Sequence, residues 1–320
     1  MFGALASLPS IPLAPAPTPV EELARLRAAV NAAPRLLVKR DDTIGFAFGG
    51  NKVRKMRLVA AHARQTGADT LITCGGIQSN HARVTAAAAA KLGLGCILVV
   101  NGTAPERPTA NALLDGLLGA EVRYVASRED RAPAMEIAAG EIRARGGRPY
   151  VIPIGASTPL GAAAFVQAIA ELLQQIDPPD VIIHSTSSGG TQAGLVAGCA
   201  LAGVGSRVIG ISADEPSASL ERDIRAILAG LGPLLGFVSD RFSEAEVVVD
   251  DRFVGGGYGV PTAASREAIE LAARTEALFL DPTYTSKAMA GLIHYVRHAT
   301  FSHDQTVLFW HTGGQVGLFA

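Results

Sequence analysis

The chain has 320 residues, a formal net charge of −1, 18% charged residues and 5% aromatic residues. This length predicts two domains and a core large enough to be stable without disulfides. The near-neutral charge gives no electrostatic basis for binding nucleic acid or an acidic membrane surface. No run approaches the roughly 20 apolar residues of a membrane span. The proline-rich start, Met1 to Pro19, lacks the basic segment of a signal peptide, so we expect a cytoplasmic protein.

The cysteines, Cys74, Cys96 and Cys199, show no CxxC spacing. This pattern argues against a disulfide framework and against a zinc site. We therefore expect buried, reduced thiols and no structural metal.

The predicted elements begin near the N-terminus, where Thr18 and Pro19 followed by Glu21 and Glu22 are typical of a helix start. Beyond this, β-branched runs alternate with alanine-rich amphipathic runs. The predicted strands are Leu36–Lys39, Thr70–Thr73, Cys96–Val100, Val122–Val125, Tyr150–Ile152, Val181–His184, Arg207–Ile211 and Val307–Trp310. The predicted helices include Lys52–Gln65, Asn80–Leu92, Ala110–Leu118, Ala132–Arg145, Leu160–Gln175 and Gln192–Ala202.

Strands separated by helices of this length predict βαβ crossovers and an α/β fold with mostly parallel, twisted sheets. The strands are continuous apolar runs, as expected when helices cover both faces of a sheet. Glycine pairs follow or lie near several of them: Gly49-Gly50, Gly75-Gly76, Gly189-Gly190 and Gly313-Gly314. Because the working residues of such sheets follow the carboxyl ends of the strands, these pairs indicate a binding cleft.

The segment from Ser185 to Gly194 reads STSSGGTQAG and joins a predicted strand to a predicted helix. Its hydroxyls and its helix-start amides would form an anion cradle. No GxxxxGK[ST] motif is present, so the expected anion is a phosphate that does not belong to a nucleotide.

Lys52 follows Gly49-Gly50 at the start of a predicted helix. The positive end of a helix disfavours an ammonium, which would lower the pKa of this lysine and free its amine for carbonyl chemistry. Taken alone, Lys52 could equally be a solvated surface lysine.

Three segments together resemble the D-cysteine desulfhydrase and 1-aminocyclopropane-1-carboxylate (ACC) deaminase family, whose members use pyridoxal phosphate (PLP). They are residues 49–55 (GGNKVRK), 75–83 (GGIQSNHAR) and 281–291 (DPTYTSKAMAG), and the resemblance runs from about Pro17 to the C-terminus. It implies the fold of the tryptophan synthase β-subunit, with two three-layer α/β lobes. Residues 1–52 and 153–320 would form a large PLP-binding domain, and residues 53–152 a smaller domain inserted in it. Family membership also implies a homodimer.

The resemblance also implies roles for individual residues. Lys52 would carry PLP covalently and act as the base, with Ser79, Tyr258 and Tyr284 as further catalytic residues. Asn51, Asn80, Ser188, Gly189, Gly190, Thr191 and Thr312 would bind the cofactor, with Asn80 at its phenolic oxygen. The substrate would contact Ser79 through its carboxylate, and also Gln78, His81, Tyr258, Tyr284 and Thr285.

Thr312 would hydrogen-bond the pyridine nitrogen of the cofactor. A neutral hydroxyl leaves this nitrogen less protonated than a carboxylate would, so the ring is a weaker electron sink. This favours prompt loss of a β-substituent over reactions that need a long-lived carbanion.

The expected reaction is therefore β-elimination from a small amino acid. In this family a threonine after the second tyrosine, as at Thr285, is typical of desulfhydrases, whereas ACC deaminases carry glutamate there. We thus expect D-cysteine to give pyruvate, sulfide and ammonium. ACC deaminase and L-cysteate sulfo-lyase activities are alternatives, and a non-catalytic protein that binds PLP or an amino acid is an alternative of another class.

Overall fold

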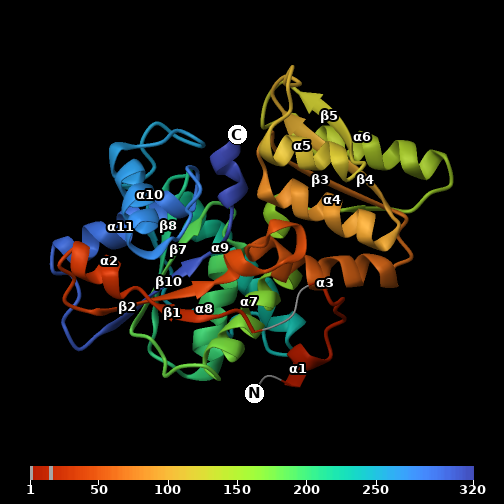
Figure 1. Cartoon of the computed structure of the whole chain (residues 1–320). Helices are drawn as coiled ribbons and strands as arrows, with labels where there is room; N and C mark the ends of the chain where they lie inside the picture. The colour runs from red at the N-terminus through yellow and green to blue at the C-terminus, as the bar shows by residue number, and fades with distance from the viewer. Residues whose placement is uncertain (1–2, 14–16) are drawn as a thin grey trace.

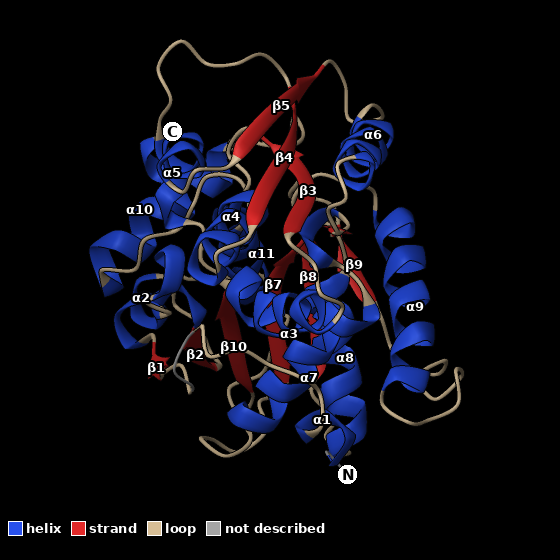
Figure 2. Cartoon of the chain, turned by 90° about the vertical axis from the view of Figure 1, so that its right-hand side faces the viewer, coloured by secondary structure: helices blue, strands red, loops and turns tan. Residues whose placement is uncertain are grey.

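The computed structural model describes residues 3–13 and 17–320 and contains two β-sheets with helices on both faces (Figures 1 and 2). The larger sheet has the order β1-β2-β10-β7-β8-β9 and the smaller one the order β5-β4-β3-β6. Every strand pair is parallel except β1–β2. The α/β fold with two three-layer units and mostly parallel sheets is therefore confirmed.

The strands in chain order are β1 (Val20–Glu22), β2 (Arg35–Arg40), β3 (Thr70–Gly76), β4 (Gly95–Asn101), β5 (Glu121–Val125), β6 (Pro149–Val151), β7 (Val181–Thr186), β8 (Arg207–Ser212), β9 (Val248–Asp250) and β10 (Thr306–His311). The helices are α1 (Gly3–Ala6), α2 (Ala24–Ala29), α3 (Asn51–Gln65), α4 (Asn80–Leu92), α5 (Ala110–Leu117), α6 (Arg131–Ala144), α7 (Pro159–Leu172), α8 (Gly190–Ala202), α9 (Ser217–Leu234), α10 (Ala263–Glu276) and α11 (Thr285–Arg297). All the predicted strands and helices from residue 36 onward are confirmed, with small shifts at their ends.

The central strands of the larger sheet show why continuous apolar runs form three layers. Alternate side chains of a strand point to opposite faces. In β10, Val307 and Phe309 pack against the layer of α2, α10 and α11, whereas Leu308 and Trp310 pack against α7, α8 and α9. Both faces of the strand are thus buried, which removes the need for polar residues at alternate positions.

The smaller sheet is built in the same way. Leu71 and Leu98 face the layer that contains α3 and α4, whereas Ile72 and Ile97 face α6. Its four strands all come from residues 70–151, which agrees with a separate inserted unit. Helix α3 contacts both α4 and α7, however, and so joins the two units. The boundaries at residues 52/53 and 152/153 stay a prediction.

The helix start predicted at Thr18 to Glu22 is wrong. Val20–Glu22 forms β1, which pairs antiparallel with Leu37–Lys39 of β2. The hydroxyl of Thr18 donates to Asp41 Oδ1 at 3.0 Å instead of capping a helix. Pairing with a strand some 20 residues away overrides the local preference, which is all that the sequence pattern reports.

The cysteines Cys74, Cys96 and Cys199 are buried and unpaired. No helix of residues 3–13 and 17–320 is long and apolar enough to cross a membrane.

Candidate active site

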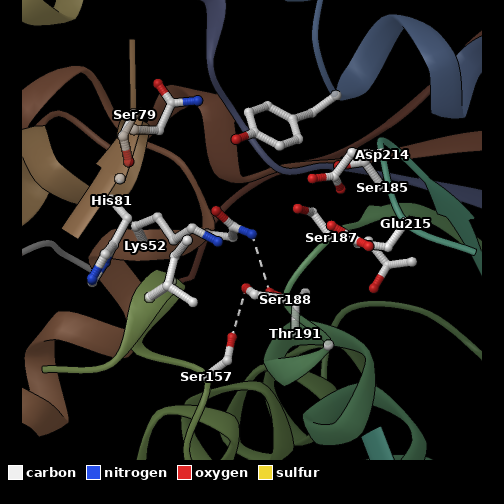
Figure 3. Close-up of a pocket in the computed structure, with 18 of the residues that line it drawn as sticks. Lys52, Ser79, His81, Ser157, Ser185, Ser187, Ser188, Thr191, Asp214 and Glu215 are labelled. Atoms are coloured by element: carbon white, nitrogen blue, oxygen red, sulfur yellow. Dashed lines mark hydrogen bonds between the residues drawn. The ribbon is translucent and has the colours of Figure 1, made fainter. Parts of the chain in front are cut away.

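A cavity of about 500 Å³ lies where strands of both sheets end. Gly75 and Gly76 reach it from the end of β3, Ser185 from β7 and Thr312 from the segment after β10. The carboxyl ends of parallel strands are where α/β proteins place ligand sites. Figure 3 shows Lys52 extending into this cavity, with Ser79 on one side and Ser185, Ser187 and Asp214 on the other.

Most of the residues predicted for the site line this cavity, although they come from distant parts of the chain. They are Asn51, Lys52, Ser79, Asn80, His81, Ser188, Gly189, Thr191, Tyr258, Tyr284 and Thr312. Gln78, Gly190 and Thr285 do not line it. Gly190 nevertheless lies next to it, because its amide donates to Ser157 Oγ at 3.2 Å.

Lys52 lies in the first turn of α3, which is docked against the segment after β10. Asn51 N donates to the Thr312 carbonyl at 3.0 Å. Gly50 adopts φ +99°, and a Cβ there would lie 2.7 Å from the Thr312 oxygen, so only glycine fits. Burial lowers the pKa of Lys52 to about 8, so neutral amine is available near neutral pH. The low pKa expected for Lys52 thus has burial as its physical cause.

The start of α8 forms an anion cradle. Gly189 has a left-handed backbone, and it lines the cavity together with Thr191 of the first turn of α8. The amide of Gly190, between them, donates to Ser157 Oγ at 3.2 Å. Ser157 and Ser188 lie beside it with their hydroxyl oxygens 2.8 Å apart (Figure 3). On the other side, Asn51 Nδ2 donates to Thr191 Oγ1 at 3.1 Å, which ties α3 to α8.

Lys55 lies next to this cradle through Ser157, although it does not itself line the cavity, and it was not predicted. It follows Lys52 by one helical turn, is fully buried, and donates to the Gly155 carbonyl at 3.1 Å and to Ser157 Oγ at 3.2 Å. A Cβ at Gly190 would lie 2.8 Å from its Nζ. Burial and the neighbouring charge of Lys52 hold its pKa well below the ordinary value. A buried lysine amine that is held by a carbonyl and a hydroxyl next to the start of α8 fits the phosphate of PLP.

Ser79 and Asn80 stand at the start of α4. Ser79 caps this helix by accepting the Ala82 amide at 3.2 Å. Asn80 Oδ1 accepts from Arg83 and Asn111, at 2.8 and 3.0 Å. With its oxygen occupied, Asn80 can offer only amide hydrogens, which suits the predicted contact with a phenolic oxygen.

His81 is buried, and its Nε2 lies 2.8 Å from Thr73 Oγ1. Burial and the charges of Lys52 and Lys55 hold its pKa well below the ordinary value, so the ring is neutral. A neutral ring at the cavity wall provides shape and hydrogen bonding but no charge.

Tyr258 and Tyr284 both line the cavity and contact each other through their hydroxyl groups. Their hydroxyl oxygens lie 2.6 Å apart and their rings pack edge to face. Burial raises the pKa of both hydroxyls, that of Tyr284 well above its ordinary value. Both are therefore protonated at neutral pH, and one proton of the pair remains free to be donated.

Two buried charged residues position this pair. Lys287 Nζ donates to the carbonyls of Ala213, Val254 and Gly257, at 2.8, 2.9 and 2.8 Å, and so fixes the loop that carries Tyr258. Asp281 accepts from the amides of Thr283, Tyr284 and Thr285, at 2.9, 2.8 and 2.8 Å, and fixes the segment that carries Tyr284.

Thr285 and Gln78 lie outside the cavity because their polar groups are engaged elsewhere. Thr285 is fully buried, and its hydroxyl donates to Asp281 Oδ1 at 2.6 Å. The side chain of Gln78 bonds the backbone of Thr109 and Asn111, at 3.3 and 2.9 Å. The structure therefore does not bring these two side chains to the cavity as direct substrate contacts.

The segment after β10 brings Thr312 to the cavity, where its hydroxyl lies 3.1 Å from Ser185 Oγ. The hydroxyls of Thr312 and Ser185 are neutral, as expected for a hydrogen-bond partner of the pyridine nitrogen.

Further charged residues that line the cavity were not predicted from the sequence. They include Arg128, Arg131, Asp214 and Glu215. No motif marks them, because Arg128 and Arg131 follow β5, Asp214 and Glu215 follow β8, and the four come together only in the fold. Arg128 contacts Glu215 at 3.1 Å and Asp214 at 3.5 Å and covers the Tyr258 ring. Within the described ranges, no group of three acidic, histidine or cysteine side chains is placed to hold a metal ion.

Comparisons with known proteins give matches over nearly the whole chain. A family model described as "Pyridoxal-phosphate dependent enzyme" matches residues 11–313. A D-cysteine desulfhydrase of Klebsiella pneumoniae subsp. pneumoniae is 39% identical over 324 residues, which cover 99% of this chain and 97% of the relative. A D-cysteine desulfhydrase of Salmonella typhi is 38% identical over the same shares.

Solved structures share the fold. The crystal structure of an ACC deaminase homologue superposes with a TM-score of 0.91 at 34% identity, covering 99% of this chain and 95% of that one. Threonine deaminase isoform 2 of Solanum lycopersicum has a TM-score of 0.68 at 16% identity, covering 97% and 82%, and shows the fold alone.

Proposed function

The chain belongs to the family of pyridoxal-phosphate-dependent enzymes, with PLP as its cofactor, and on that basis we propose that it catalyses β-elimination from a small amino acid, D-cysteine in the first place. The observation that carries the proposal is the position of Lys52. Lys52 lines the same cavity as the anion cradle and both tyrosines, and its pKa is lowered to about 8. The cofactor, when bound, supplies a conjugated ring that accepts the electrons released from the α-carbon.

Some residues of the site bind the cofactor and the substrate, and others transfer protons. Lys55, Ser157 and the amides at the start of α8 hold the phosphate. The positive end of α4 at Ser79 holds the substrate carboxylate. Lys52 would hold the cofactor, and its neutral amine would remove the α-proton of the substrate.

The tyrosine pair completes the reaction at the leaving group. Tyr258 and Tyr284 hold one free proton between them, which one of them donates to the departing sulfur. The C–S bond breaks with its electron pair on sulfur, giving hydrogen sulfide. The remaining 2-aminoacrylate reacts with water to give pyruvate and ammonium.

The test is a substrate panel with the purified holoenzyme. D-cysteine, L-cysteine, both enantiomers of cysteate, β-chloroalanine and ACC are compared by release of pyruvate or 2-oxobutanoate, sulfide or sulfite, and ammonium. We expect the highest kcat/KM with D-cysteine. Absence of product from every β-substituted substrate would contradict the proposal, and would favour a protein that binds PLP without catalysis.

ACC deaminase activity is the second candidate, supported by the ACC deaminase homologue that superposes over 99% of this chain. L-cysteate sulfo-lyase activity is a further alternative within the same panel. Release of 2-oxobutanoate from ACC at a kcat/KM above that for D-cysteine would favour the deaminase.

We also propose that the protein acts as a homodimer in the cytoplasm. Sedimentation of the holoenzyme at micromolar concentration tests the assembly, and fractionation of expressing cells tests the location. A monomer at all concentrations would contradict the first proposal.

A further inference from the structure

Asp41 is a fully buried carboxylate that does not line the active-site cavity. It directly follows β2, and both of its oxygens accept hydrogen bonds. Oδ1 accepts from the Thr18 hydroxyl at 3.0 Å and from Arg54 Nη2 at 2.8 Å. Oδ2 accepts from Arg54 Nε at 2.9 Å and from Trp310 Nε1 at 2.8 Å. One carboxylate thus joins three segments that are far apart in the sequence.

Two of these segments carry residues of the active site. Arg54 lies in the first turn of α3, two positions after Lys52. Trp310 lies on β10, two positions before Thr312. Both Lys52 and Thr312 line the cavity. Asp41 therefore holds the start of the helix that carries Lys52 against the strand that leads to Thr312.

The contact between Arg54 and Asp41 fixes an orientation as well as a distance. A planar guanidinium that gives two parallel hydrogen bonds to a carboxylate can rotate little without breaking them. The other edge of Arg54 is held by Glu171 of α7, with Nη1 2.8 Å from Oε2 and Nη2 2.9 Å from Oε1. The side chain of Arg54 is 5% exposed, so water offers little replacement for either partner. The first turn of α3 is therefore fixed from two sides.

The charges of this cluster are balanced. Glu171 also accepts from Lys39 at 2.6 Å, so the two carboxylates face the two bases Arg54 and Lys39. Buried ion pairs add little net stability, because the loss of hydration offsets most of the attraction, but removal of one partner is costly. The main consequence of the cluster is geometric, since its bonds all depend on one arrangement of the elements that carry these groups.

The amine of Lys52 depends on this arrangement. Within the described ranges its Nζ has no hydrogen-bond partner, so its position follows from that of the helix start (Figure 3). Burial is what lowers the pKa of Lys52 to about 8. A helix start displaced toward the solvent would hydrate the amine, and its pKa would rise toward the ordinary value of 10.5.

We propose that Asp41 is a positioning residue for Lys52, because through Arg54 it fixes the first turn of α3 against β10. Trp310 supplies the attachment to β10, and Glu171 limits the movement of Arg54 on the other side. This inference rests on the proposed attachment of PLP to Lys52 and is independent of the substrate.

The test measures the reaction of PLP with the cofactor-free protein, in which the Lys52 amine condenses with the cofactor aldehyde and water is released. Asp41→Asn keeps the shape of the side chain and removes its charge. We expect the attachment rate near neutral pH to fall about 10- to 100-fold, as for a displaced reacting group. The pH at which the rate levels off should rise from about 8 by about one unit. Trp310→Phe, which removes one donor and no charge, should change both quantities in the same direction and by less.

Binding of pyridoxamine 5′-phosphate separates positioning from general damage, because this compound has the ring and the phosphate of PLP but no aldehyde. We expect its dissociation constant to change less than about threefold in both variants. Asp42→Asn is the matched control, since this neighbouring carboxylate pairs with Arg40 at 2.9 Å instead of with Arg54. It should leave the attachment rate unchanged.

An attachment rate in folded Asp41→Asn equal to that of the wild type would overturn the inference. An equal loss of attachment and of pyridoxamine 5′-phosphate binding would overturn it as well, because the site would then be damaged as a whole. If Asp41→Asn does not fold, an unchanged levelling pH in Trp310→Phe has the same consequence. Failure of the proposed role of Lys52 is recognised separately, because attachment would then survive in Lys52→Ala. Absence of D-cysteine cleavage would affect neither result.

Discussion

The hydroxyl groups of Tyr258 and Tyr284 lie 2.6 Å apart in the cavity, on segments fixed separately by Lys287 and Asp281. Each tyrosine hydroxyl has the other as its hydrogen-bond partner, and burial raises the pKa of both. The proposed role of the pair as a proton donor gives the first prediction.

Tyr258→Phe removes one hydroxyl of the pair and leaves the ring in place. We expect kcat for D-cysteine to fall by about 100-fold, the usual contribution of a positioned acid. The loss with β-chloroalanine should be much smaller, because chloride departs without a proton. Tyr295→Phe, whose hydroxyl bonds Asp250 at 2.6 Å, is the control. Equal losses with both substrates would show that Tyr258 acts on another step.

Lys52→Ala should abolish turnover, by at least about 10³-fold, since the variant lacks both the attachment point and the base. The cofactor should be held only non-covalently. Reduction with borohydride followed by peptide mass analysis should label Lys52 in the wild type and nothing in the variant. The circular dichroism spectrum should be unchanged. Normal turnover in this variant would refute the assignment of Lys52.

Lys55→Met should weaken PLP binding by about 10- to 100-fold, because one charged hydrogen bond to the phosphate is lost. The measurement is titration of the cofactor-free variant with PLP, followed by absorbance. Lys91→Met, at the exposed end of α4, is the control. A dissociation constant equal to that of the wild type would remove Lys55 from the phosphate site.

The pH dependence of cofactor attachment follows from the lowered pKa of Lys52. Only the neutral amine reacts, and its fraction rises with pH and reaches one half at about 8. Below that pH the rate at which PLP attaches to the cofactor-free protein should rise roughly tenfold per pH unit, and above it the rate should level off. A rate that keeps rising toward pH 10.5 would show that the amine is not buried.

Thr285 is expected to act through the fold and not by touching the substrate. Thr285→Ser keeps the hydroxyl bond to Asp281 and should leave stability within about 1 kcal/mol. Thr285→Glu would bury a second carboxylate beside Asp281, at a cost of about 3 kcal/mol or more. Thermal unfolding measures both changes. If Thr285→Glu lowers D-cysteine cleavage without loss of stability, the side chain does reach the pocket.

The sequence by itself determined the element order and the identity of the chemical groups. Continuous apolar runs separated by amphipathic stretches are a local property, which is why the strands from residue 36 onward could be predicted. Lys52, Ser79 and the start of α8 could likewise be recognised, because contiguous motifs carry them.

Only the tertiary structure decided which groups face the cavity. Lys55 is an ordinary basic residue in the sequence, and the role proposed for it follows from its burial next to Gly155 and Ser157, neighbours that are distant in the chain. Thr285 shows the reverse, since it lies in a recognised motif yet its hydroxyl is turned to Asp281. Val20–Glu22 became a strand for the same reason, because its pairing with β2 supplies hydrogen bonds that no local pattern records.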